Sequence, residues 1–199
     1  VDKITSRLNI GNIYVNRNQI GAIVGSQPFG GEGLSGTGPK AGGPNYIKRF
    51  TMSEKNEWVK PKLDNSVSLD IVQDAINKLN NHKKRLKSHK LPGPTGESNV
   101  LSFYSRGVVL CLGPTFDMAL LQAETAKENG CSTLIITEDA EGESTIKGSL
   151  NRADLQFLNG FDAVVAWSDK EDQRDILRAL ASRSGPIIPL INDLNFSDR

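Results

Sequence analysis

The chain has 199 residues, which is room for one or two small domains, and its formal net charge is +1. A charge so close to zero gives no bulk attraction to nucleic acid or to an anionic membrane surface. Apolar residues make up 37% of the chain, and no apolar run reaches the roughly 20 residues that a membrane-spanning helix needs. We therefore expect no transmembrane segment and no nucleic-acid partner.

The first quarter of the chain is dominated by glycine. Residues 11–25 indicate a short β-branched strand followed by a glycine-rich approach. Residues 27–44 contain too many Gly and Pro residues for the interior of a helix or a strand. Residues 1–50 are also too few to bury a core. In isolation we expect them to be partly disordered or to pair with another copy through strand edges.

Residues 65–90 have apolar positions close to helical spacing, which predicts a helix with Ser68 as N-cap. Its last part is basic, and cations are favoured near a helix C-terminus. We interpret this basic run as a solvated helix end. The alternative, a nucleic-acid or membrane patch, is disfavoured because no aromatic residues are interleaved with the lysines. Residues 91–99 are dense in Pro and Gly and predict a loop or linker.

The remainder alternates between apolar strands and helices, which predicts an α/β fold with a small Rossmann-like parallel sheet covered on both faces. The expected strands are 107–112, 131–137, 161–167 and 186–191, and the expected helices are 117–129, closed by Gly130, 150–158 and 169–183. We expect three parts: residues 1–50, a helix and linker over 51–105, and an α/β domain over 106–199, cut short at its end.

The α/β part lacks the signature of a dinucleotide site. The turn after its first strand has one glycine, Gly113, followed by a proline without an N–H group, and we expect Asp117 to cap the next helix. The acidic group over 138–143 is interpreted as a solvated loop. Cys111 and Cys131 lie in apolar runs and are expected to be small buried side chains. His82 and His89 lack partners at metal-ligand spacing, so no metal site is predicted.

Pro28-Phe29-Gly30-Gly31 followed by Ser35-Gly36 resembles the last active-site segment of the aldehyde dehydrogenase superfamily. The longer run over 34–44 is similar to the proline utilization A family of bifunctional proline-catabolic enzymes. Residues 93–97 and the α/β pattern after them look like the additional C-terminal domain of its longer members. Neither cysteine has the family's nucleophile context, so we expect a C-terminal fragment of a larger enzyme that is inactive alone.

The resemblance implies a parent enzyme that oxidises proline, through pyrroline-5-carboxylate and glutamate semialdehyde, to glutamate with FAD and NAD. It implies that the backbone amides of Gly21 and Ala22 hold the substrate carboxylate and that Phe29 packs on the substrate's aliphatic stem. From spacing alone, Gly21 would be only a turn and Phe29 only a core residue.

The expected partners are the rest of the parent chain, glutamate semialdehyde and further copies in a homo-oligomer. We expect no cofactor on this fragment. Two cysteines without a secretory signal suit the cytoplasm, where the parent could associate peripherally with a membrane. The alternative is that the α/β half is an independent module that binds a nucleotide or a protein.

Overall fold

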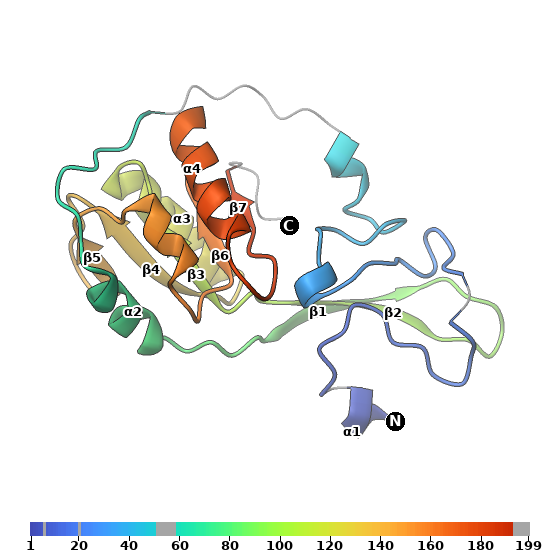
Figure 1. Cartoon of the computed structure of the whole chain (residues 1–199). Coiled ribbons are helices and arrows are strands. Elements are labelled where there is room, and N and C mark those ends of the chain that lie inside the picture. Colours follow the sequence, from blue (N-terminus) through green and yellow to red (C-terminus); the bar gives the residue numbers. More distant parts are fainter. Residues whose placement is uncertain (6, 20, 51–58, 193–199) are drawn as a thin grey trace.

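A computed structural model describes residues 1–5, 7–19, 21–50 and 59–192. Figure 1 shows an α/β unit on one side and, on the other, residues 1–50 around a long β-hairpin that projects from this unit. No helix in the described residues is long and apolar enough to cross a membrane. The α/β fold predicted from the sequence is confirmed.

The α/β unit is built on a parallel five-stranded sheet with the strand order β5-β4-β3-β6-β7. The strands are β3 (Val108–Cys111), β4 (Ser132–Thr137), β5 (Thr145–Lys147), β6 (Ala163–Val165) and β7 (Leu190–Ile191). The helices are α2 (Leu69–Asn77), α3 (Phe116–Glu128), the 3-10 helix η3 (Arg152–Gln156) and α4 (Lys170–Ala181). Continuous apolar strands are therefore explained by burial on both faces of a parallel sheet.

Alternate residues of each strand enter different cores. Val108 and Leu110 of β3 pack with α2, η3 and α4 on one face. Val109 and Cys111 pack with α3 on the other face. The α3 side of that contact is made of three alanines, Ala119, Ala123 and Ala126, and small side chains let a helix lie close to the sheet.

The ends of the two long helices follow ordinary capping chemistry. Thr115 is the N-cap of α3, and its hydroxyl accepts a hydrogen bond of 3.4 Å from the Met118 amide. The expectation that Asp117 caps this helix is wrong, because Asp117 lies inside the first turn. Gly130 follows the last turn with φ +71°, the left-handed conformation that favours glycine, as expected. Asp169 caps α4 by accepting from the Asp172 amide at 2.9 Å.

The predicted helix over 65–90 is wrong beyond Asn77. Residues Arg85–Leu91 form strand β1, which pairs antiparallel with β2 (Asn99–Tyr104), and the Pro/Gly-rich loop joins these two strands. The basic run is therefore not a helix end. Its charged side chains belong to an exposed strand. The strand that pairs with it lies beyond the loop, and helical periodicity carries no information about such a partner.

Smaller differences concern short elements. No strand forms in the described residues of 11–25, where the glycine-rich contacts described below are found instead, and residues 150–158 hold only η3. The strands expected over 161–167 and 186–191 shrink to three and two residues, and β5 was not expected. The division into 1–50, 51–105 and 106–199 stays a prediction, of which 51–58 and 193–199 lie outside the described residues. Within it, Val72 and Ile76 of α2 pack in the same core as β3.

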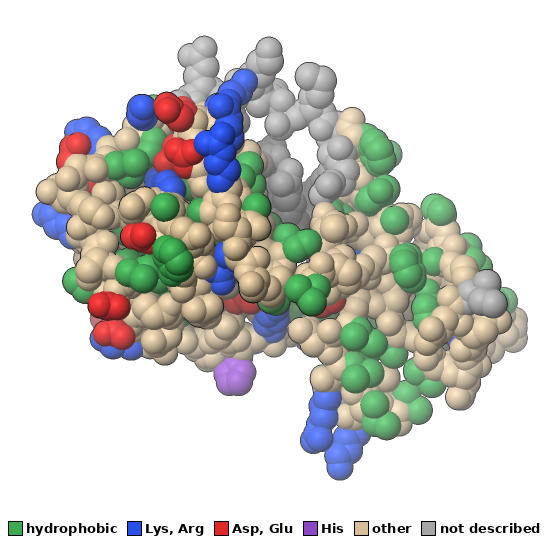
Figure 2. All heavy atoms as spheres, viewed as in Figure 1, with side chains coloured by type: hydrophobic (Ala, Val, Ile, Leu, Met, Phe, Trp, Pro, Cys, Tyr) green, Lys and Arg blue, Asp and Glu red, His purple; other side chains and the backbone are tan. Residues whose placement is uncertain are grey.

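Residues 1–50 contribute differently to the molecule. They carry α1 (Asp2–Thr5) and the 3-10 helices η1 (Gly33–Ser35) and η2 (Ile47–Phe50). None of the described residues in this part belongs to either hydrophobic core. Figure 2 shows many apolar side chains at the surface of this part. Its shape must therefore come from polar and backbone contacts.

Candidate functional site

Lys40 and Asn12 hold the glycine-rich segment together. The Lys40 ammonium donates to the carbonyl oxygens of Gly11 and Gly30, at 2.8 and 2.6 Å. The Asn12 side chain donates to the Pro28 carbonyl at 2.9 Å and accepts from the Gly30 amide at 3.0 Å. Partial burial of Lys40 lowers the pKa of its ammonium, because desolvation disfavours the charge.

Two glycines in this segment are required by close packing. A Cβ atom on Gly11 would lie 2.0 Å from the Gly30 carbonyl oxygen, and one on Gly31 would lie 2.3 Å from the Ser35 carbonyl oxygen. Both distances are far below van der Waals contact, so any other residue would force the backbone apart. The glycine pattern therefore specifies one fold of this loop.

The three residues predicted to touch substrate lie on the exposed side of this loop. Gly21 has φ +76° and open space where a side chain would be, and Ala22 is exposed. Phe29 is 53% exposed, while its backbone pairs with Ala41 through hydrogen bonds of 3.0 and 2.8 Å. The hydrogen bonds with Ala41 fix the backbone of Phe29. No described hydrogen bond or ring contact connects Gly21, Ala22 and Phe29 with one another. Phe29 is therefore not a core residue of this chain.

The loop is attached to the β-hairpin through Glu97. The Glu97 carboxylate accepts from the Gln27 side chain at 2.8 Å, and Arg17 lies 3.6 Å from it. Hydrogen bonds from Asn99 and then Gln27 lower the pKa of the Glu97 carboxyl. Sequence reasoning missed this contact, because Gln27 and Glu97 are 70 residues apart and nothing local marks the pair.

The turn after β3 is closed by its own side chains. Gln122 is fully buried; its side chain accepts from the Gly113 amide at 3.2 Å and donates to the Gly113 carbonyl at 2.9 Å. The Trp167 amide, two residues after β6, also donates to this carbonyl, at 2.9 Å. Adjacent carboxyl ends of parallel strands are where nucleotides bind in such sheets. Here the Gly113 amide is already used, so it is not available to a phosphate.

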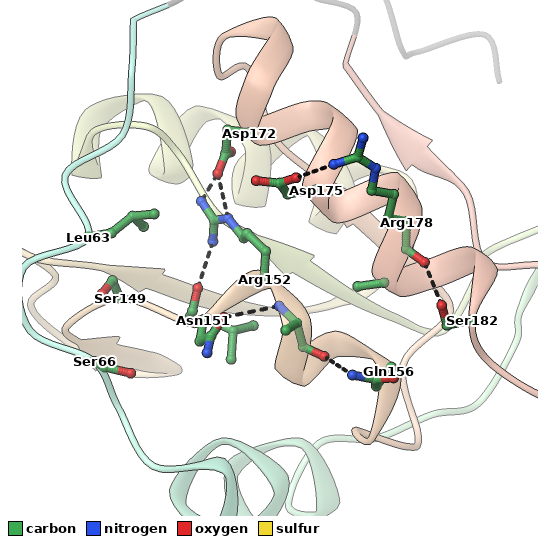
Figure 3. A pocket seen from close by; sticks show the side chains of 13 residues that line it. Leu63, Ser66, Ser149, Asn151, Arg152, Gln156, Asp172, Asp175, Arg178 and Ser182 are labelled. Atoms are coloured by element: carbon green, nitrogen blue, oxygen red, sulfur yellow. Dashed lines mark hydrogen bonds and ion pairs between the residues drawn. The ribbon is translucent and has the colours of Figure 1, made fainter.

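A cavity of about 610 Å³ lies between η3, α4 and the segment that precedes α2. Figure 3 shows two Arg–Asp pairs on its wall, Arg152 with Asp172 and Arg178 with Asp175. The first pair is buried and the second is exposed. Since each charge faces an opposite charge, the cavity has no net attraction for an ion.

The remaining candidates are not reactive groups. Cys111 is buried, and desolvation raises the pKa of its thiol far above the usual range, so it does not supply a thiolate. Cys131 is partly buried, and His82 and His89 are exposed. In the described part of the chain, no three His, Cys, Asp or Glu side chains gather as a metal site would require. Glu138 is not simply solvated as expected, because it binds Asn65.

Known proteins match both parts of the chain. Residues 1–56 match the aldehyde dehydrogenase family. The bifunctional protein PutA of Klebsiella aerogenes is 31% identical over 221 residues, covering 94% of this chain and 17% of that protein. PutA of Escherichia coli (strain K12) is 32% identical over 222 residues, with the same coverage of both chains.

Two further matches are shorter. The 1-pyrroline-5-carboxylate dehydrogenase of Bacillus cereus (strain B4264) is 53% identical over 47 residues, which is 24% of this chain and 9% of that protein. A solved structure of proline utilization A with proline bound in remote sites matches 58% of this chain and 14% of that chain. Its identity is 27% and its TM-score is 0.40, which is too low to support a structural argument.

Residues 1–56 thus match the aldehyde dehydrogenase family, the family to which the motif over 28–36 is similar. Over nearly its whole length the chain is similar to the bifunctional PutA proteins. It spans only 17% of the length of these two relatives.

Proposed function

We propose that this chain is part of a bifunctional proline-catabolic enzyme. Such an enzyme oxidises proline with FAD and then oxidises glutamate semialdehyde to glutamate with NAD, as an aldehyde dehydrogenase. The observation that carries the proposal is one continuous similarity to PutA over 94% of the chain, which includes both the glycine-rich loop and the α/β unit. The short match to 1-pyrroline-5-carboxylate dehydrogenase supports the semialdehyde as the aldehyde substrate.

Residues 1–50 supply one wall of the semialdehyde pocket in this proposal. The backbone amides of Gly21 and Ala22 bind the α-carboxylate, since small residues let two N–H groups converge on an anion. Phe29 packs on the aliphatic stem of the substrate. Phe29 is half exposed, and the Lys40 and Asn12 contacts hold its loop in place. An exposed side chain on a fixed backbone is suited to contact a ligand or a neighbouring domain.

The opposite wall, the nucleophile and the bound NAD belong to the rest of the larger protein. NAD bound there would supply the hydride acceptor, while this chain would position the substrate. Exposed apolar side chains on residues 1–50 support the presence of such a neighbouring domain, because large exposed apolar patches are normally covered by a partner. Those at least 53% exposed are Val1, Ile4, Ile10, Ile23, Val24, Phe29, Leu34, Ile47 and Phe50.

The α/β unit is a non-catalytic cover in this proposal. Its Gly113 amide is used by Gln122, and its buried Cys111 is not ionised at neutral pH. A cover over the path between two active sites would keep the reactive semialdehyde from escaping. The larger enzyme would assemble as a homo-oligomer, with this chain's exposed apolar residues facing either the rest of its own chain or another copy.

The substrate site is tested by Ala22→Val in the full-length enzyme. A β-branched side chain beside the amides keeps the carboxylate away, so we expect the KM for glutamate semialdehyde to rise roughly tenfold, the loss of about one charged hydrogen bond. The KM for NAD should stay unchanged. Ala181→Val, an exposed change at the end of α4, is the matched control. A large rise in the KM for NAD with an unchanged KM for the semialdehyde would refute the assignment.

The covering role is tested by NADH production with and without residues 106–199. Semialdehyde oxidation should survive the deletion, while NADH production from proline should acquire a lag as the intermediate escapes. Unchanged kinetics in both assays would mean that the α/β unit is an independent binding module. The isolated 199-residue chain should produce no NADH from semialdehyde and NAD, and turnover by the pure chain would contradict the proposal.

A further inference from the structure

Glu97 ends the tight turn that joins β1 to β2. The Glu97 amide donates to the Pro94 carbonyl at 3.0 Å, and Gly96 between them has φ +88°, the left-handed conformation that favours glycine. The Asn99 side chain donates to the Glu97 carboxylate at 2.8 Å. The turn and Asn99 therefore hold this carboxylate in place at the far end of the hairpin, beside residues 1–50 (Figure 1).

The Glu97 carboxylate contacts both ends of the loop that carries Gly21 and Ala22. Its Oε1 accepts from Gln27 Nε2 at 2.8 Å, and its Oε2 forms an ion pair with Arg17 Nη1 at 3.6 Å. The Gln27 side of this contact is buried, with Gln27 only 6% exposed. In the chain, Arg17 comes before the two candidate substrate residues and Gln27 comes after them. One side chain of the hairpin therefore joins the two ends of this loop.

The bond to Gln27 also fixes the backbone next to Ala22. The Gln27 amide donates to the Ile23 carbonyl at 2.7 Å, and the Ser26 amide donates to the same carbonyl at 3.2 Å. Ile23 directly follows Ala22, so this turn places Ala22 relative to the Gln27 side chain. Gly21 has open space where a side chain would be, and Ala22 is exposed, so packing of their own side chains does little to fix them.

We propose that Glu97 is a positioning residue for the substrate carboxylate. By joining Arg17 to Gln27, its own carboxylate sets the shape of the loop between them and keeps the amides of Gly21 and Ala22 directed at one anion. A loop of small residues with exposed amides binds an anion well only when its conformation is fixed before the ligand arrives. This inference rests on the proposed function, in which these two amides bind the α-carboxylate of the semialdehyde.

A carboxylate is needed at this place because donors approach it from both sides. Oε1 accepts from Gln27 and Asn99, while Oε2 faces the Arg17 guanidinium. In Glu97→Gln one of the two oxygens becomes an NH₂ group, which donates and cannot accept from any of these partners. The variant therefore keeps the size of the side chain but loses the contacts on one side of it.

Kinetics of the full-length enzyme with two aldehydes test the proposal: glutamate semialdehyde, and butyraldehyde, which has no carboxylate. We expect Glu97→Gln to raise the KM for glutamate semialdehyde roughly fivefold, leave its kcat within about twofold, and leave the KM for butyraldehyde unchanged. Arg17→Met should have the same selective effect. Adding it to Glu97→Gln should change little further, because both variants remove one shared interaction. Glu143→Gln, an exposed change in the α/β unit, is the matched control.

Hydrogen exchange of the 199-residue chain gives a readout that needs no enzymatic activity. Backbone amides of residues 21–27 should exchange several-fold faster in Glu97→Gln, while those of β3 and β4 keep their wild-type rates. The inference fails if the KM values for both aldehydes rise equally, if neither changes, or if amides of β3 and β4 exchange as much faster as those of the loop. A wild-type enzyme without semialdehyde oxidation would refute the proposed function instead, and hydrogen exchange would still decide whether Glu97 holds the loop.

Discussion

The buried guanidinium of Arg152 donates hydrogen bonds to both carboxylate oxygens of Asp172. Nε lies 2.8 Å from Oδ1 and Nη2 lies 3.3 Å from Oδ2, and both side chains are only 6% exposed. Nη1 of the same guanidinium donates to the Leu150 carbonyl at 3.3 Å. The pair therefore joins η3 to the first turn of α4 across the wall of the cavity in Figure 3.

Removing one member of this pair should be strongly destabilising. Arg152→Met leaves the Asp172 carboxylate buried without its partner, and we expect the free energy of unfolding to fall by about 3–5 kcal/mol. Urea denaturation followed by circular dichroism measures the loss. Arg178→Met breaks the exposed pair with Asp175 and should cost under about 0.5 kcal/mol. Equal losses in the two variants would contradict the importance of burial.

Gln122→Leu should destabilise the turn after β3. The new side chain is of similar size, but it leaves the Gly113 amide without its buried acceptor, at a cost of about 1–3 kcal/mol in the free energy of unfolding. Glu124→Leu, an exposed change on the same helix, is the control and should stay within roughly 0.5 kcal/mol. If the Gln122 variant were as stable as this control, the side chain would not be needed to close the turn.

Stability should depend on pH through Glu138. Hydrogen bonds from the Asn65 backbone amide and then from its side-chain amide lower the pKa of the Glu138 carboxyl in the folded chain. A carboxyl whose folded pKa is lowered contributes stability above its unfolded pKa and loses it as the pH falls through the folded value.

The difference in unfolding free energy between the wild type and Glu138→Gln should therefore be largest above about pH 5. It should shrink as the pH falls below roughly 4.3, the ordinary pKa of Glu. Urea denaturation at several pH values measures it, with the exposed Glu141→Gln as control. A difference that stays constant down to pH 3 would show that the carboxylate charge plays no part.

The sequence predicts the centre of the fold well because its signals there are local. Residues 107–112 are apolar apart from the first glycine, residues 131–137 contain the apolar run Leu134-Ile135-Ile136, and the two segments become β3 and β4. The helix over 169–183 begins with Asp169 and has charged residues on its outer face, and it becomes α4. Apolar periodicity and helix caps depend on residues that are close in the sequence, so the elements predicted from them are found in the structure.

The hairpin could not be predicted in the same way. Arg85–Leu91 is polar and basic, and what makes it a strand is the backbone of Asn99–Tyr104. That pairing depends on residues beyond a loop of Pro and Gly. For the same reason, the sequence did not indicate the hydrogen bond of Gln27 with Glu97 or the contact of the Lys87 ammonium with the Phe103 ring.

The candidate substrate residues were found only through a family resemblance. Spacing alone offers no reason to choose Gly21 or Ala22 among the 19 glycines and the many small residues of the chain. Nor does it indicate that the Phe29 ring stays half exposed, because exposure depends on what the rest of the loop leaves uncovered.

The bond from Gln27 to Glu97 spans 70 residues, and this has a consequence for the order of folding. Closing so long a loop in an unfolded chain costs roughly 4 kcal/mol of entropy, more than the about 1–2 kcal/mol that the hydrogen bond and the partly exposed Arg17–Glu97 ion pair return. Residues 1–50 therefore attach after the hairpin and the sheet have formed, and they detach first. Amide protons of the glycine-rich loop should exchange with solvent by local opening, long before those of β3 and β4 do.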